Sequence, residues 1–285
     1  MYYLIGISLL FTTFFTINVA SSLAAAGLWR ISQRFVSEWS PARRSAVLFA
    51  LRVTPVALAI LFVFGFVLPA FLLYEPHHSG ETVGLKLTMV VTISAFGIAA
   101  AAFRVFASWW RTRRLVSDWL DSSERAVIDG ISMPAYRLRH AFPVFAIVGI
   151  FRPRMFIAEQ LLDKLDATEL SAVITHELGH VAGRDNLRRV MMRLCGDLLV
   201  LPVGRVLDRD WADASESAAD EFAVQYGGKR SALDLASALI KIARDIPAGP
   251  MPEMPSAAFA TKNAGEALAD RIRRLLALAD IDTSI

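Results

Sequence analysis

The sequence predicts a mainly α-helical membrane protein, in which N-terminal transmembrane helices precede an α+β domain with a small antiparallel sheet. Hydrophobic residues make up 55% of the 285-residue chain, against roughly 45–50% in a soluble domain. The excess lies in long uncharged runs within the first 110 residues. The rest of the chain mixes polar and apolar residues and is long enough to bury one core.

Three uncharged runs are the candidate membrane spans, since a helix needs about 20 apolar residues to cross a bilayer. Buried helices of a large soluble protein are the alternative, but the runs exceed the usual length of a core helix. No basic residue precedes the first run, which is also too long for a signal peptide. The predicted spans cover about residues 4–26, 53–74 and 87–107.

The basic residues around these runs predict the orientation in the membrane, because basic loops stay in the cytoplasm. One group lies between the first and second runs: Arg30, Arg34, Arg43 and Arg44. The other follows the third run: Arg104, Arg111, Arg113 and Arg114. We therefore expect a multi-pass protein of the inner (plasma) membrane, with its N-terminus outside and the later chain in the cytoplasm. The basic residues thus account for the net charge of +3 by fixing the orientation in the membrane, and we expect no nucleic-acid partner. The single cysteine, Cys195, suits a reducing compartment.

We divide the chain into a membrane domain, 1–117, and a cytoplasmic domain, 118–285. In the second domain, 143–149 and 155–158 are short segments rich in β-branched and aromatic residues, separated by turn formers. They predict a two-stranded hairpin. The apolar stretch 190–207 is interrupted by polar residues and a proline, so that a fourth span and an amphipathic core or interfacial helix both remain open.

A helix is predicted from Asp166 to about Gly183. Asp166 and Glu169 have the spacing of a capping box. His176 and His180 are four residues apart on this helix, which places both imidazoles on one face. Both can then reach a single zinc ion, and Glu177 lies where it can accept a proton from a bound water.

A catalytic zinc site needs a third protein ligand. Glu216 is the best candidate, because a helical segment would place it on one face with Asp220. Asp220 could then accept the second N–H of a ligand histidine. Asp185 could pair with Arg184 or support the end of the histidine helix. The competitors of Glu216 are Asp210, Asp213 and Glu221.

The segment from Phe151 to Asp185 resembles the membrane zinc metallopeptidases of the BlaR/MecR type, in which a strand and a proline turn precede a His-Glu-x-x-His helix. The resemblance extends over about 140–280 and includes the related Ste24/HtpX group of gluzincins. It implies that His176, His180 and Glu216 bind Zn²⁺, that Glu177 is catalytic and that the active site faces the cytoplasm. The matching positions are Arg152-Pro153, Arg184-Asp185, Glu216 with Asp220, and Arg271-Ile272 with Leu275-Leu276. Because no penicillin-binding sensor domain follows Ile285, we do not expect direct β-lactam sensing.

The sequence therefore predicts a zinc metalloendopeptidase in a lipid bilayer, with Glu177 as general base and a role in regulatory or quality-control proteolysis. Its substrate would be a protein or peptide: a cytoplasmic repressor, a misfolded membrane protein or the chain itself. The alternative is a non-catalytic signal transducer or scaffold with a vestigial metal site. A second oxyanion donor would be an arginine or a tyrosine, for instance Tyr226.

Overall fold

The chain folds into two compact units in the computed structural model. One unit comprises Met1–Trp109 and Arg188–Trp211, and the other comprises Trp110–Leu187 and Ala212–Ile285. The predicted division into 1–117 and 118–285 stays a prediction; by their contacts, residues 110–117 group with the second unit and 188–211 with the first. The structure describes residues 2–36, 38–75, 84–128, 131–140, 142–198, 203–245 and 264–280.

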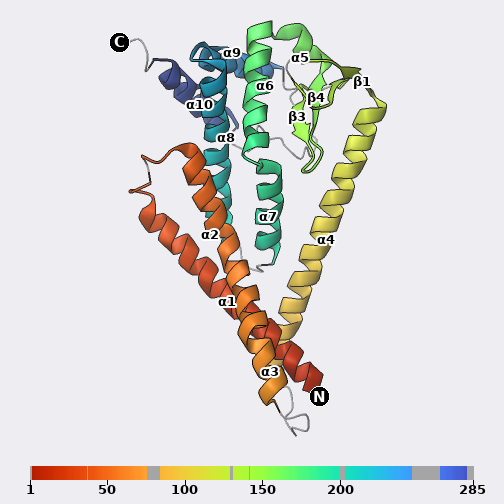
Figure 1. The fold of residues 1–285 in the computed structure, drawn as a ribbon, viewed down its shortest axis with the longest axis vertical. Coiled ribbons are helices and arrows are strands. Elements are labelled where there is room, and N and C mark those ends of the chain that lie inside the picture. Colours follow the sequence, from red (N-terminus) through yellow and green to blue (C-terminus); the bar gives the residue numbers. More distant parts are fainter. Residues whose placement is uncertain are drawn as a thin grey trace. The chain divides into compact units, whose positions relative to one another are not determined.

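Long apolar helices form most of the first unit, and α1 and α2 lie side by side (Figure 1). Three helical segments are long and apolar enough to cross a membrane: Ile5–Ser32, Pro41–Tyr74 and Val91–Asp121. They confirm the three predicted spans, although the second helix begins earlier than predicted. The helices are α1 (Tyr2–Ser32), α2 (Pro41–Phe62), the π-helical η1 (Val63–Val67), α3 (Leu68–Tyr74) and α4 (Leu85–Asp121).

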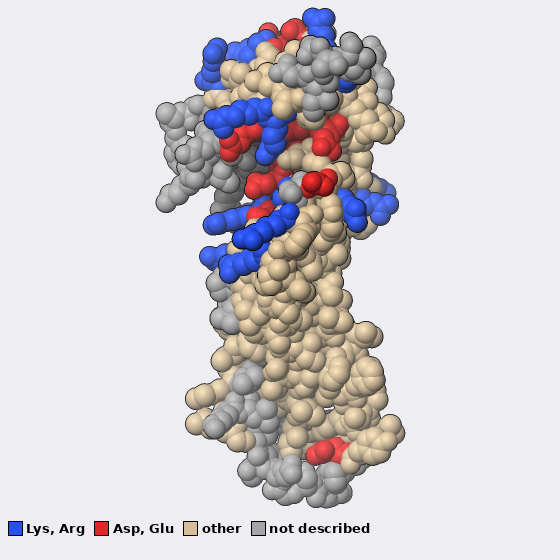
Figure 2. Space-filling view, turned by 90° about the vertical axis from the view of Figure 1, so that its left-hand side faces the viewer, with Lys and Arg blue, Asp and Glu red and all other residues tan. Residues whose placement is uncertain are grey.

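The surface of this unit suits contact with lipid. Much of the space-filling view is a continuous uncharged area, and basic side chains gather at one end of it (Figure 2). Large apolar side chains of this unit, such as Phe64, Phe66 and Leu73, are exposed. In water, an exposed apolar area of this extent would be unstable. These features make the chain a multi-pass membrane protein.

The ambiguous stretch 190–207 contains no membrane-length helix in its described part. Helix α7 (Asp185–Asp197) has only 13 residues, too few for a span of about 20. Helix α8 (Arg205–Gly227) begins after it. Between the two helices, the described residues continue to 198 and resume at 203.

A buried ion pair joins α8 to α2 within the first unit. The side chain of Arg52 is 4% exposed, and its Nε donates to Oδ1 of Asp208 at 2.8 Å. Its guanidinium also packs against Gly196 and Gly204, where an added Cβ would lie 2.5 Å from guanidinium atoms. The glycines thus leave room for a charged group in a buried position.

The second unit contains a four-stranded sheet with the order β1-β2-β4-β3. Its strands are β1 (Ser123–Ala126), β2 (Ala135–Leu138), β3 (Phe145–Val148) and β4 (Arg154–Ala158). The antiparallel β3–β4 pair confirms the predicted hairpin. The prediction of an antiparallel sheet is wrong in one pairing, because β2 runs parallel to β4 and the sheet is mixed.

Helices pack against this sheet to form the core of the second unit. Phe156 and Met155 of β4 are fully buried, together with Leu161 of α5 and Leu235 of α9. Helix α6 carries the two histidines and packs against α9, and α9 packs in turn against α10. The helices are α5 (Glu159–Lys164), α6 (Ala167–Ala182), α9 (Arg230–Arg244) and α10 (Ala264–Asp280).

Candidate metal centre

The capping box of α6 is present as predicted and fixes where the histidine helix begins. Oδ1 of Asp166 accepts from the backbone N–H of Glu169 at 2.9 Å, and Glu169 Oε2 accepts from the backbone N–H of Asp166 at 3.0 Å. The carboxylate of Glu169 is buried and also accepts from Ser237 (2.7 Å) and Lys241 (2.6 Å) of α9. The cap therefore also joins α6 to α9.

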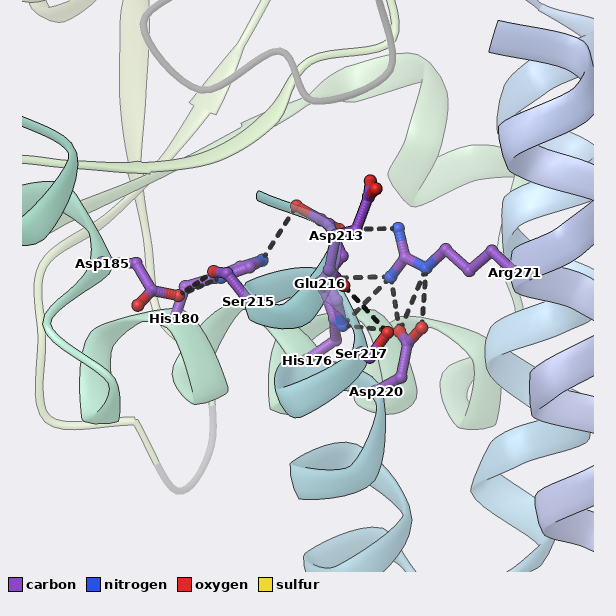
Figure 3. A network of polar contacts seen from close by, with 9 residues as sticks. All are labelled: His176, His180, Asp185, Asp213, Ser215, Glu216, Ser217, Asp220 and Arg271. Carbon is purple, nitrogen blue, oxygen red and sulfur yellow. Dashed lines mark hydrogen bonds and ion pairs between the residues drawn. The ribbon is translucent and has the colours of Figure 1, made fainter. Parts of the chain in front are cut away.

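His176, His180 and Glu216 come together at the centre of the second unit (Figure 3). Their ligand atoms all lie within 4.8 Å of one another. Nε2 of His180 is 3.5 Å from Glu216 Oε1, and Nε2 of His176 is 3.7 Å from Glu216 Oε2. Among the described residues, this is the group of His, Cys, Asp and Glu side chains that could hold a metal ion.

Each imidazole contacts a carboxylate through its Nδ1. Asp220 Oδ1 is 3.0 Å from Nδ1 of His176, and Asp185 Oδ2 is 2.8 Å from Nδ1 of His180. When Nδ1 carries the proton that these carboxylates accept, each Nε2 keeps a lone pair, which is the form of the imidazole that binds a metal. Ser215 also donates to Asp185 Oδ2 at 2.5 Å. Asp185 therefore contacts the histidine helix and α8 together.

The residue that the sequence analysis missed is Arg271. Its position on the polar side of α10 would predict a solvent-exposed arginine. In the structure, however, Arg271 is only 5% exposed. Its Nη2 lies 2.6 Å from Asp220 Oδ1 and 3.0 Å from His176 Nε2, and its Nη1 lies 3.0 Å from Glu216 Oε2 (Figure 3). The available signal was the resemblance of the Arg271 region to the family's closing helix.

The charges of this cluster favour a cation. Burial alone would lower the pKa of His180, but Glu216, the hydrogen bond to Asp185 and the charge of Glu177 outweigh it and raise this pKa to about 9. The carboxylates thus create a strongly negative potential at the imidazole. The side chain of Glu177, the residue after His176 on α6, is half-buried.

The carboxylates themselves are ionised. Burial would raise the pKa of Asp220, but the charge of Arg271 and the contact with His176 lower it to about 2. The pKa of Glu216 is also lowered, since Arg271 and the histidines outweigh the effect of burial. An ionised Glu216 is the form that binds metal.

A glycine inside the His-Glu-x-x-His sequence permits the close approach of α6 and α8. A Cβ at Gly179 would lie 3.0 Å from Ala219 Cα and 3.1 Å from Phe222 Cβ. Contacts this short would force the helices apart at that point. Gly179 therefore allows α8 to bring Glu216 close to the histidines.

The donor set fits zinc. Bonds of about 2.0–2.1 Å in a tetrahedral site place neighbouring ligand atoms roughly 3–4 Å apart. The separations of 3.5 and 3.7 Å between Glu216 oxygens and the two Nε2 atoms lie in this range. Two imidazoles and a carboxylate also match the ligand set of zinc peptidases.

Two of the alternative residues lie elsewhere. Asp210 accepts from Trp29 Nε1 at 2.5 Å and from Gln33 Nε2 at 3.1 Å, in the first unit. Tyr226 is 69% exposed and packs on Phe222, ten residues beyond Glu216 on α8. This corresponds to about 15 Å along the helix axis, so that Tyr226 is not placed as an oxyanion donor.

The described residues thus combine membrane-length helices with a His-His-Glu group on α6 and α8, a ligand set that zinc peptidases use. Residues 145–208 match the profile of Peptidase family M48. The match covers β3, β4 and the histidine helix.

Curated proteins that are similar to this chain are proteases by name. The chain is 26% identical to "Protease HtpX" of Hahella chejuensis over 151 residues, which are 47% of this chain and 51% of the relative. It is 25% identical to "Protease HtpX" of Acinetobacter baumannii (strain AYE) over 173 residues, 53% and 56% of the two chains. The chain thus spans about half the length of the curated relatives it matches. Of the two groups named in the predicted resemblance, these relatives belong to the Ste24/HtpX group and not to the BlaR/MecR type.

Proposed function

We propose that this chain is a membrane zinc metalloendopeptidase that hydrolyses peptide bonds with Glu177 as general base. The observation that carries the proposal is the convergence of His176, His180 and Glu216, with Asp220 and Asp185 behind the imidazoles. Zinc held there would lower the pKa of a bound water from about 15.7 towards 7 and polarise the scissile carbonyl.

The residues of the chain carry out the other tasks. Glu177 takes the proton of the attacking water and passes it to the leaving nitrogen. Asp185 and Asp220 hold the two imidazoles in the tautomer that presents Nε2. Arg271 holds Glu216 and Asp220. An extended substrate can add to the outer edge of β3.

The substrate class that we propose is a polypeptide, cleaved in regulatory or quality-control proteolysis. The resemblance of Phe151 to Asp185 to the BlaR/MecR type supports a regulatory role, with a cytoplasmic repressor, a misfolded membrane protein or the chain itself as substrate. The basic connections support an active site in the cytoplasm and an N-terminus outside, in the inner membrane.

Proteolysis is tested with purified wild type and Glu177→Gln in detergent, both loaded with zinc. Wild type should degrade casein, and Glu177→Gln should retain one equivalent of zinc and lose at least about a hundredfold in rate, as expected for loss of a general base. Equal rates for the two proteins would contradict the mechanism. A zinc-loaded wild type that cleaves neither casein nor itself would instead support the scaffold alternative.

The orientation is tested by cysteine labelling in a Cys195→Ser background. Tyr3 and Glu124 are 79% and 77% exposed. In intact spheroplasts, a membrane-impermeant maleimide should label Tyr3→Cys, whereas Glu124→Cys should react only after lysis. The opposite pattern would show that the active site faces outward.

A further inference from the structure

Strand β3 is an edge strand whose outward groups follow from its hydrogen bonds. In the register with β4, Phe145 faces Ile157 and Ile147 faces Met155. The N–H of Ala158 donates to the carbonyl of Val144 at 2.7 Å. Because hydrogen-bonded and non-bonded pairs alternate, Phe145 and Ile147 direct their backbone N–H and C=O away from β4. With the order β1-β2-β4-β3, that direction is the outer edge of the sheet among the described strands.

Part of this outer edge is already occupied by a side chain. Nδ2 of Asn186 donates to the carbonyl of Ile147 at 3.0 Å and to that of Gly149 at 3.2 Å. One amide group therefore binds two carbonyls at positions i and i+2, the spacing with which a neighbouring strand would bind them. In this part of the edge, the side chain of Asn186 takes the place of a strand.

Asn186 is itself anchored to the metal centre. It is the second residue of α7 and follows Asp185, which contacts His180. The turn before it is tight, since Arg184 has a positive φ of 54°. The amide therefore stands at a defined position relative to the end of the histidine helix.

We propose that Asn186 sets the register in which a substrate backbone pairs with β3. This inference rests on the proposed function. The outward groups left for an extended peptide are the N–H and C=O of Phe145 and the N–H of Ile147. Only one of these, the carbonyl of Phe145, can accept a substrate N–H. A peptide is thus prevented from sliding along the edge, and the scissile bond is held at one distance from the catalytic centre.

The experiment is a backbone N-methyl scan, which removes one peptide N–H at a time. Fluorescent casein peptides, unmodified and N-methylated, are titrated against zinc-loaded Glu177→Gln, which binds without cleavage. We expect one sensitive N–H, with a loss of about fivefold in affinity, the effect of one hydrogen bond. In Glu177→Gln/Asn186→Ala the carbonyls of Ile147 and Gly149 are freed, so that at least a second sensitive N–H should appear, two residues from the first.

Gln160→Ala is the matched control, because the Gln160 side-chain amide also donates to a backbone carbonyl, that of His140, at 3.5 Å. In the N-methyl scan, Glu177→Gln/Gln160→Ala should lose affinity at one peptide N–H only, as Glu177→Gln does. Two sensitive positions in the Asn186-containing protein, or identical scans with and without Asn186, would overturn the inference. If Asn186→Ala does not fold, the number of sensitive positions in the Asn186-containing protein alone decides. The scan needs no cleavage, so its failure is distinguishable from an absence of proteolysis in wild type.

Discussion

Arg271 of α10 forms a buried ion pair with Asp220 of α8, with 2.6 Å between Nη2 and Oδ1. Nε of the same guanidinium is 2.9 Å from Oδ2. The C-terminal helix thus supplies a cation to the carboxylate behind His176. Without it, the buried carboxylate of Asp220 and the partly buried carboxylate of Glu216 would face each other with less compensation, at a cost of about 1–3 kcal/mol or more.

Arg271→Gln should therefore weaken zinc binding about 10–100-fold, the effect seen when groups behind a metal ligand are removed. Competition with a fluorescent chelator measures the affinity. Arg273→Gln is the control, because Arg273 lies on the same helix with its side chain 74% exposed. Equal zinc affinity for Arg271→Gln and wild type would show that α10 does not contribute to the centre.

Replacement of Gly179 should separate the third ligand from the histidines. Gly179→Leu places a large side chain where even a Cβ would lie 3.0 Å from Ala219. We expect a loss of zinc binding of at least tenfold, and a smaller loss for Gly179→Ala. Gly65→Ala is the control, since nothing lies within 4 Å of a Cβ there. Stoichiometric, tight zinc in Gly179→Leu would contradict this role.

The Glu169 carboxylate should make stability depend on pH below neutrality. Burial would raise its pKa, but Lys241, Ser237 and the N–H of Asp166 outweigh burial and lower the pKa below its ordinary value of 4.5. A lowered pKa contributes stability that is complete above about 4.5 and is lost as the pH falls through the native value. Glu169→Gln should thus cost about 1–2 kcal/mol at pH 7, from a weakened cap and ion pair.

This difference should shrink as the pH falls below about 4.5, because Glu169 of the unfolded chain takes up a proton first and the native carboxylate does so only at lower pH. Denaturant unfolding of both proteins in detergent at pH 7 and at pH 4 measures it. Ser237→Ala removes one hydrogen bond and leaves the charge, so its cost should change less with pH. A Glu169→Gln effect that is constant across this range would disprove the charge contribution.

The Arg52–Asp208 pair should respond asymmetrically to mutation. The side chain of Arg52 is 4% exposed and that of Asp208 is 40% exposed. Asp208→Asn leaves a buried charge without its partner and should destabilise by about 2–3 kcal/mol. Arg52→Met leaves a carboxylate that water can reach, so its cost should be smaller. Thermal unfolding in detergent compares them, and the reverse order would be evidence against this explanation.

The sequence was sufficient for the parts of this protein that depend on local patterns. Runs without charge predicted the three spans, since a bilayer imposes length and polarity on any helix that crosses it. The spacing of His176 and His180, and of Asp166 and Glu169, fixed their geometry once a helix formed, because positions three and four apart share a face. The β3–β4 hairpin followed from composition for the same local reason.

Tertiary structure decided what depends on contacts between distant segments. Strands β1 and β2 have only four residues each and weak patterns, and the parallel β2–β4 pairing arises from packing. Arg271 is 51 residues from Asp220 along the chain, and Asn186 is 39 residues from Ile147. From the sequence alone, a polar residue on an amphipathic helix is predicted to be exposed to solvent, because its partner is not known. The partner is brought to it by burial of apolar surface elsewhere, which periodicity does not encode.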